Sequence, residues 1–264
     1  MFIKFFKSSL SNVFMTYWGI VKDIIRKADI VLAILDARMP ELSRNEDLEG
    51  LVIRSKKKLF LVFNKIDLVS KEHLTFLRKR YQKAFFVSGP KNIGINKIKI
   101  SILIAAKRDS IENPVVGVVG YPNVGKSAII NALAHRAKAV MSPIAGTTRG
   151  VQIVNAGSLK VLDSPGVFPY EDDEVKLGVL AAKNPDSLKN PHLVASEIIK
   201  LFLYSNKKAL EDFYGFKIDE NLDSYEVMLL IGQERKFLLK GGITDENRTS
   251  MQIIRDWQKG KLRI

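Results

Sequence analysis

The pattern Gly-x-x-x-x-Gly-Lys-Ser at residues 120–127 constrains the fold of this chain more than any other feature. An apolar, β-branched run at residues 114–119 precedes it, and apolar residues at helical spacing follow from Lys126 onward. A strand, a glycine loop and a helix in this order form a phosphate-binding loop, in which backbone N–H groups and a helix N-terminus surround the phosphates. The sequence therefore predicts an α/β fold built around a nucleotide phosphate site.

Each residue of this loop has an expected role. Gly125 lets the backbone approach the phosphates closely, and Lys126 is expected to reach the β- and γ-phosphates. The hydroxyl of Ser127 is expected to bind Mg²⁺. The remaining positions of the predicted phosphate site are Asn123, Val124 and Ala128.

A second motif, Asn64-Lys65-Ile66-Asp67, follows an apolar strand pattern at residues 58–63. Asp67 can accept hydrogen bonds from N1–H and the exocyclic amine of guanine, a pair of donors that adenine lacks. Lys65 is expected to lay its aliphatic stem over the base, and Asn64 to tie this loop to the phosphate loop. Such residues are common in turns, but after a strand, in a chain with a phosphate loop, they predict a guanine site.

A third element follows the next strand pattern, at residues 84–87. Ser88 and Gly89 stand where GTPases often have Ser-Ala, with a backbone N–H that meets guanine O6. Glycine at this position departs from that pattern but keeps the N–H. We therefore include both residues in the predicted base site.

Two further loops lie downstream of the phosphate loop. In Ala145 to Arg149 we expect Thr148, or alternatively Thr147, to coordinate Mg²⁺. In Asp163-Ser164-Pro165-Gly166, the aspartate is expected to hold Mg²⁺ through water and the Gly166 N–H to contact the γ-phosphate. The expected metal site is Ser127, Thr148 and Asp163, and the expected catalytic residues are Lys126, Thr148 and Gly166.

The order of these motifs is unusual, because most GTPases carry the base reader after the phosphate loop. Base reader first, then phosphate loop, then the two switches, resembles the circularly permuted GTPases of the YlqF/RbgA type. The tract Asp36-Ala37-Arg38-Met39-Pro40 and the helical pattern at residues 254–262 extend the resemblance over most of the chain. It implies a P-loop GTPase fold with a doubly wound, mostly parallel sheet, acting on GTP in assembly of the large ribosomal subunit.

The resemblance also bears on catalysis. Val167 stands where Ras-type GTPases have the glutamine that orients water, and valine cannot form that hydrogen bond. Slow turnover, completed by another group or a partner, is therefore expected. The histidine that some relatives carry near the N-terminus has no counterpart, since the three histidines are His73, His135 and His192.

Asn123 has two interpretations. An asparagine at this place resembles that of GTPases that bind K⁺ beside the nucleotide, where the cation acts like an arginine finger. Alternatively, it is a loop asparagine that tolerates an unusual backbone angle. The sequence favours neither.

The charge is unevenly distributed. The first 170 residues carry more than the whole net charge of +14, and the remainder is slightly acidic. One nucleotide needs less positive charge than this, so the basic clusters at residues 56–58, 78–80 and 107–108 indicate a surface for ribosomal RNA. Solvated lysine-rich helix faces are the alternative.

The chain is expected to have two domains. Residues 1–170 alternate strand and helix patterns, whereas residues 171–264 contain only helical patterns, which predicts a GTPase domain and a small C-terminal all-α domain. The second switch directly precedes this helical domain, which could therefore respond to the γ-phosphate. No apolar run spans a membrane and no cysteine is present. We expect a cytoplasmic protein that is a monomer off the ribosome.

Other functions remain open. A binding module stabilised by GTP with negligible turnover is compatible with Val167. A GTPase acting at a membrane or on another partner would also explain the basic surface. A nucleotide kinase is disfavoured, because Asp67 selects guanine and no lid motif is evident.

Overall fold

The computed structural model describes residues 18–134, 152–163 and 173–264. The predicted residues Thr147, Thr148, Gly166 and Val167 lie outside this range, as does His135. Contacts within the chain separate two units. One contains residues 18–67 and 74–163 of the described chain, and the other contains residues 68–73 and 173–264.

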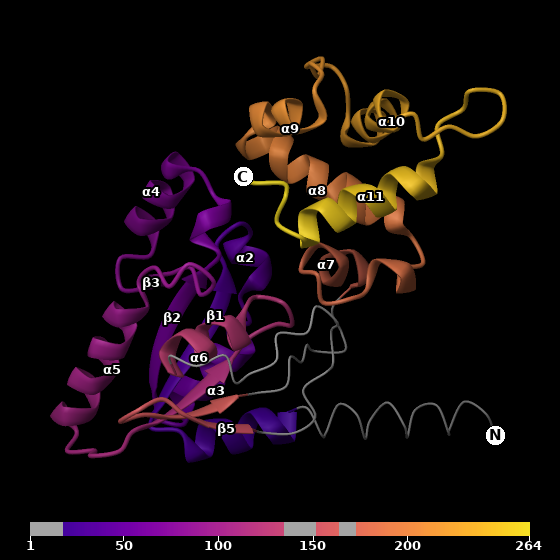
Figure 1. The fold of residues 1–264 in the computed structure, drawn as a ribbon. Helices are drawn as coiled ribbons and strands as arrows, with labels where there is room; N and C mark the ends of the chain where they lie inside the picture. The colour runs from indigo at the N-terminus through magenta and orange to yellow at the C-terminus, as the bar shows by residue number, and fades with distance from the viewer. Residues whose placement is uncertain (1–17, 135–151, 164–172) are drawn as a thin grey trace, which may run out of the picture. The chain divides into compact units, whose positions relative to one another are not determined.

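The first unit is built on a six-stranded sheet with the strand order β3-β2-β1-β4-β6-β5 (Figure 1). The strands are β1 (Ile30–Asp36), β2 (Lys58–Asn64), β3 (Phe85–Phe86), β4 (Val115–Val119), β5 (Gln152–Asn155) and β6 (Lys160–Asp163). All neighbours pair in parallel except β5, which runs antiparallel to β6 at the edge. The predicted doubly wound, mostly parallel sheet is therefore confirmed.

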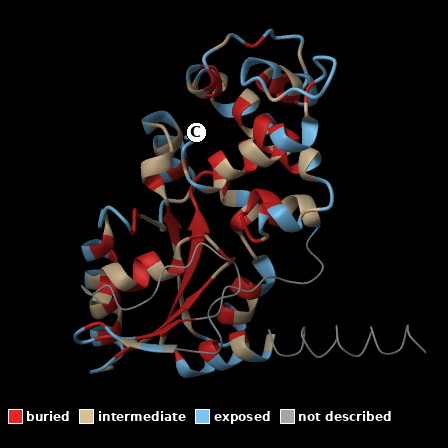
Figure 2. Ribbon diagram, turned by 45° about the vertical axis from the view of Figure 1, so that its right-hand side comes forward, coloured by how far each residue is buried: buried red, intermediate tan, exposed pale blue. Residues whose placement is uncertain are grey.

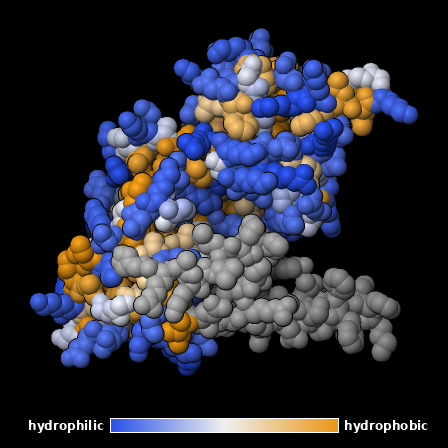
Figure 3. All heavy atoms as spheres, viewed as in Figure 1, coloured by the Kyte–Doolittle hydropathy of each residue, from blue (hydrophilic) through white to orange (hydrophobic). Residues whose placement is uncertain are grey.

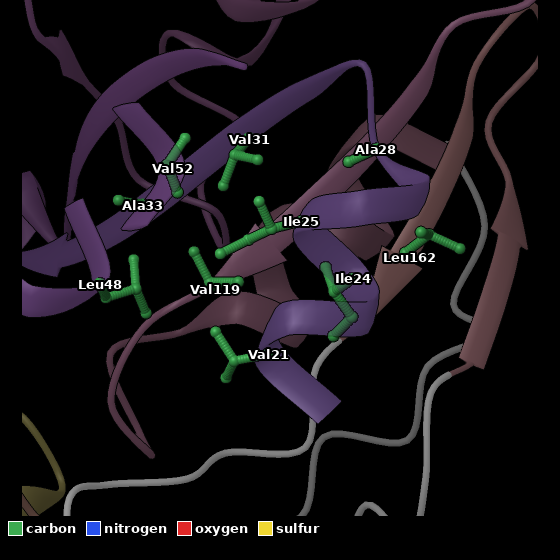
Figure 4. Close-up of a cluster of buried hydrophobic side chains, with 10 residues drawn as sticks. All are labelled: Val21, Ile24, Ile25, Ala28, Val31, Ala33, Leu48, Val52, Val119 and Leu162. Atoms are coloured by element: carbon green, nitrogen blue, oxygen red, sulfur yellow. The ribbon is translucent and has the colours of Figure 1, made fainter. Parts of the chain in front are cut away.

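Helices cover both faces of the sheet. On one face, the helix at residues 18–27 and α3 (Glu46–Arg54) pack against β1, β4 and β6. Figure 4 shows this cluster, in which Ile24 and Ile25 of the first helix lie among Val31, Val119 and Leu162 of the strands. Burying each such side chain contributes about 1.5–3 kcal/mol, which makes this cluster a major source of stability.

The opposite face carries the helix of the phosphate loop. α6 (Lys126–Ala134) contacts β4, β5 and β6, and α5 (Ile95–Arg108) packs beside α6. The strands between these layers are buried along most of their length (Figure 2). The short α2 (Pro40–Ser43) follows β1, and α4 (Lys71–Arg80) precedes β3. Strands buried on both faces explain the continuous apolar runs in the sequence.

One surface of this unit carries exposed apolar side chains. Figure 3 shows hydrophobic residues gathered over α5, where Ile100 and Ile104 are exposed. They stand four residues apart, on the side of α5 opposite its buried residues Ile98 and Ile102.

Within the described chain, no helix is both long enough and apolar enough to cross a bilayer.

The second unit is helical. Its elements are α7 (Glu174–Val179), the 3-10 helix η2 (Pro185–Ser187), α8 (Pro191–Ser205), α9 (Lys207–Tyr214), α10 (Ser224–Glu234) and α11 (Glu246–Gln258). α8 is central and contacts the other α-helices. The fully buried Trp257 donates its indole N–H to the Val179 carbonyl at 2.8 Å and packs edge-on against Phe202. Trp257 thus joins α7, α8 and α11 in one core.

A short segment from early in the chain, residues 68–73, also belongs to this helical unit. The Ile264 N–H donates to the Leu68 carbonyl at 3.0 Å, and the Ser70 N–H donates to the Ile264 carbonyl. Gly260 lies so close to the Leu68 side chain that an added Cβ would sit 2.9 Å from it. The helical unit is therefore assembled from two separate stretches of sequence.

Candidate functional site

The phosphate loop connects β4 to α6 and depends on two glycines with positive φ. Gly120 has φ +143°, and a Cβ there would lie 2.5 Å from the Ile34 carbonyl oxygen. Gly125 has φ +95°, and a Cβ there would collide with the side-chain nitrogen of Asn64. Other residues would be both strained and obstructed at these positions. The loop is therefore closely packed against β1 and the end of β2.

Lys126, the first residue of α6, turns back over the loop. Its Nζ donates to the carbonyls of Gly120 at 2.9 Å and Tyr121 at 2.8 Å. Burial lowers the pKa of Lys126, and the nearby Asp163 charge opposes this shift. The buried ammonium is thus held by two carbonyls of the phosphate loop itself.

Asp163 ends β6 and is 3% exposed. Its Oδ1 is buried and has no hydrogen-bond partner among the described residues. Burial raises the pKa of Asp163, and Lys126 opposes this shift. A buried, unsatisfied carboxylate oxygen costs free energy unless a cation or donor reaches it. Asp163 therefore fits a Mg²⁺ site, with the half-buried Ser127 at the start of α6 as a second oxygen donor.

The other loop positions are well defined. Asn123 has φ +59°, in the left-handed region that asparagine tolerates better than most residues. The angle agrees with the interpretation of Asn123 as a loop asparagine that tolerates an unusual backbone conformation. Val124 and Ala128 are buried and fix the loop and the first turn of α6 on the protein interior.

Asn64 connects three loops of the site. Its side-chain Nδ2 donates to the Val124 carbonyl at 2.8 Å, which ties the end of β2 to the phosphate loop. Its Oδ1 accepts from the Gly89 N–H at 3.0 Å, which ties in the loop after β3. The N–H that we expected to meet guanine O6 is thus engaged with Asn64 in this structure. The Ser88 N–H donates to the Ile93 carbonyl within the same loop.

Asp67 and Lys65 follow Asn64 directly. Asp67 lies in a 3-10 turn (η1, Ile66–Leu68) with its side chain 16% exposed, and the Lys91 ammonium is 3.8 Å from its Oδ2. Lys65 has φ +65°, an uncommon angle for a lysine. Its ammonium lies 2.8 Å from Oδ2 of Asp36. The carboxylate predicted to read guanine is therefore partly exposed, and the ammonium of the neighbouring Lys65 is held by Asp36.

Asp36 received no role from the sequence, although it lies in a tract that the resemblance identified. It ends β1 and is fully buried. Arg38 donates to both its carboxylate oxygens, from Nε to Oδ1 at 3.1 Å and from Nη2 to Oδ2 at 2.9 Å. The only feature of the sequence that points to Asp36 is its place, with Arg38, at the end of an apolar strand. Its link to Lys65 depends on the pairing of β1 with β2.

The parallel strands bring these residues to one edge of the sheet. Predicted site residues follow the carboxyl ends of β2, β3 and β4, and Asp163 ends β6. Open α/β sheets bind ligands at this edge. Thr148 and Gly166 lie outside the described residues, so their places in the site stay predictions.

Comparisons with known proteins agree with this geometry. A family model described as 50S ribosome-binding GTPase matches residues 115–220. An uncharacterised GTP-binding protein of Methanocaldococcus jannaschii is 36% identical over 92% of this chain, and the GTPase grn1 of Schizosaccharomyces pombe is 31% identical over 91%. The chain spans only 65% and 59% of the length of these two relatives.

Solved structures of YlqF from T. maritima have the same fold. The GDP-bound form gives a TM-score of 0.58 at 21% identity, covering 92% of this chain and 95% of that one. The GNP-bound form gives 0.55 at 22% identity, covering 92% and 93%. The sheet, the phosphate loop and the base loops define a P-loop GTPase fold. With its motifs in rotated order, the chain has the fold of the YlqF structures and is similar over most of its length to proteins named as GTP-binding proteins or GTPases.

Proposed function

We propose that this protein binds GTP and GDP, hydrolyses GTP slowly, and acts as a nucleotide-dependent assembly factor on the large ribosomal subunit. The observation that best supports GTP binding is the pair of hydrogen bonds made by the Asn64 side chain. Its side chain couples the phosphate loop at Val124 to the base loops at Lys65–Asp67 and Gly89. A phosphate cradle and a guanine-selective carboxylate held together in this way suit a guanine nucleotide.

The base would be held by groups on two loops. Asp67 accepts from guanine N1–H and the exocyclic amine, and the stem of Lys65 covers the base. Gly89 donates to O6 if its N–H is shared with, or released by, Asn64. Adenine would face Asp67 without matching donors, so the site discriminates by leaving a carboxylate unsatisfied.

Mg²⁺ fits the unsatisfied carboxylate of Asp163 together with Ser127, and Thr148 would complete the set. When bound, the ion supplies charge stabilisation to the phosphates. Lys126 neutralises charge that develops on the β- and γ-phosphates, and the Gly166 N–H contacts the γ-phosphate. Asn123 is the residue that would face K⁺ beside the nucleotide. Val167 supplies no hydrogen bond for water, so intrinsic turnover is slow.

The ribosomal role is supported by the matching family description, 50S ribosome-binding GTPase, and by the charge of the chain. Exposed cations such as Arg78 and Lys79 on α4 and Arg108 at the end of α5 suit ribosomal RNA. We propose that residues 1–170 bind nucleotide and RNA, and that residues 171–264 report nucleotide state to the precursor particle. The protein would act as a cytoplasmic monomer off the ribosome.

GTP turnover measured with and without purified large subunits, in K⁺ and in Na⁺, tests this function. We expect stimulation by the particles, and a K⁺ preference if Asn123 holds the cation. Tight GTP binding with flat, negligible turnover would instead identify a module stabilised by GTP. Equal binding of the GDP and GTP-analogue forms to the particles would contradict the role of the helical domain.

A further inference from the structure

We propose that Asp36, at the end of β1, is a positioning residue of the base site that holds Lys65 in the conformation needed to cover a purine ring. This inference rests on the proposed binding of guanine nucleotides. It assigns a role in base binding to the buried Asp36–Arg38 pair.

The placement of Asp36 follows from strand register. β1 and β2 pair in parallel so that Asp36 stands directly opposite Asn64, and the Ala37 N–H donates to the Asn64 carbonyl at 2.9 Å. Lys65 is the next residue after this pair. A carboxylate at the end of β1 is therefore adjacent to the first residue that leaves β2.

Contacts that do not involve Lys65 fix the position of the Asp36 carboxylate. Arg38 holds both oxygens through its side chain, and its backbone N–H donates to Oδ1 at 3.0 Å. The Asp36 N–H donates to the Ser43 hydroxyl at 3.0 Å. A bidentate arginine pair of this kind sets orientation as well as charge. Oδ2 thus presents a fixed acceptor toward Lys65, 2.8 Å from its ammonium.

The backbone of Lys65 needs such an anchor. Its φ of +65° is strained for a side chain with a Cβ, and strain of this kind persists where surrounding contacts determine the conformation. A free lysine side chain samples many rotamers, and ordering them opposes binding. Because Asp36 holds the ammonium, the stem of Lys65 is ordered before the base arrives, and less free energy is lost on binding.

A double-mutant cycle measures this coupling. The variants are Asp36→Asn, Lys65→Met and the double variant, and the readout is the Kd for GDP by isothermal titration. We expect each single change to raise the Kd about tenfold, as for losing one charge-assisted interaction. The double variant should bind no more weakly than Lys65→Met alone, because Asp36 acts through Lys65.

Glu49→Gln is the matched control. Glu49 is a buried carboxylate in the same unit and is also held by an arginine fork, from Arg44 Nε at 3.0 Å and Nη2 at 2.7 Å. Its loss should lower the melting temperature without changing the Kd for GDP. If Asp36→Asn does not fold, Asp36→Glu keeps the charge, displaces the acceptor and should still raise the Kd.

Two results would overturn the inference. One is a Kd in Asp36→Asn, or in Asp36→Glu if only that variant folds, that matches Glu49→Gln. The other is a double variant in which the two effects simply add. The proposed function fails separately, and the inference with it, if the wild-type chain binds GDP no better than ADP.

Discussion

At the scale of single residues, the site depends on side chains that serve two loops at once. Asn64 hydrogen-bonds to Val124 and Gly89, and Asp36 binds both Arg38 and Lys65. Removing one partner from a buried polar network leaves the others unsatisfied, and that penalty exceeds the net contribution of the bond itself. Substitutions at these positions should therefore affect both stability and nucleotide binding.

Asp67→Asn tests the base reader directly. The amide offers a donor where the carboxylate only accepts, so the variant should prefer xanthine to guanine nucleotides. We expect the Kd for GDP to rise at least tenfold and the Kd for xanthosine diphosphate to fall below it, measured by competition with a fluorescent nucleotide. Unchanged specificity would show that Asp67 does not read the base.

The buried carboxylate of Asp36 gives a prediction for pH. Although burial alone would raise its pKa, the charges of Arg38 and Lys65 hold the pKa of Asp36 well below its usual value. A depressed carboxylate pKa contributes stability that is present above the unfolded pKa, near 3.8, and is lost as the pH falls through the folded pKa. Asp36→Asn should therefore lower the free energy of unfolding by about 3–5 kcal/mol, equally at pH 6 and pH 8.

Urea unfolding of the wild type and Asp36→Asn at pH 8, 6 and 4 measures this difference. The difference in the free energy of unfolding between the two proteins should begin to decrease only near pH 4. Asp186→Asn serves as the comparison, since its ion pair with Arg255 is exposed and contributes at most about 1 kcal/mol. A difference that changes between pH 6 and pH 8 would mean that Asp36 titrates there.

At the scale of elements, the sequence predicted the strands that precede the nucleotide motifs, which are β2, β3 and β4. β1, β2, β4 and β6 are short apolar runs because a parallel sheet covered on both faces buries nearly every side chain. The positions of the two nucleotide motifs after strands were predictable because such motifs have fixed residue types at fixed spacing. Their common edge followed from the direction of the strands.

Other features could not be read from the sequence. The Asp36–Lys65 ion pair joins residues on two strands, and it depends on a register that local patterns do not determine. The bounds of the helices in the second unit are another such feature, as in α9 (Lys207–Tyr214), where only Leu210 and Tyr214 of the apolar residues are buried. The hydrogen bond from the Gly89 N–H to Asn64 could not be predicted either, because it joins two loops that are far apart in the sequence.

A close approach between two helices gives a prediction at this scale. Gly178 of α7 faces Val194 of α8, and a Cβ at Gly178 would lie 2.7 Å from a methyl of that stiff side chain. Gly178→Ala gains about 1 kcal/mol of helix propensity, but overpacking costs about 1–3 kcal/mol. We expect a net loss of stability in thermal unfolding. Gly19→Ala, in a helix where nothing lies within 4 Å of the added Cβ, should instead stabilise.

At the scale of the whole molecule, the chain passes between the two units more than once. It leaves the sheet unit after Asp67, contributes residues 68–73 to the helical unit, and returns to the sheet unit at Leu74. The helical unit is completed only by the later stretch from residue 173 onward. Asp67, the residue predicted to read guanine, is thus covalently joined to a segment of the helical unit.

This arrangement determines what a protease would release. A single cut between residues 163 and 173 would leave residues 68–73 attached to the sheet unit while they still pack against Gly260 and Ile264. We expect the two fragments to migrate together on a native gel and to separate only in denaturant. Leu68→Ala removes the side chain that lies against Gly260, and should let the fragments part under milder conditions. Because residues 68–73 stay in the helical unit after such a cut, cleavage of the connecting segment alone should not release that unit.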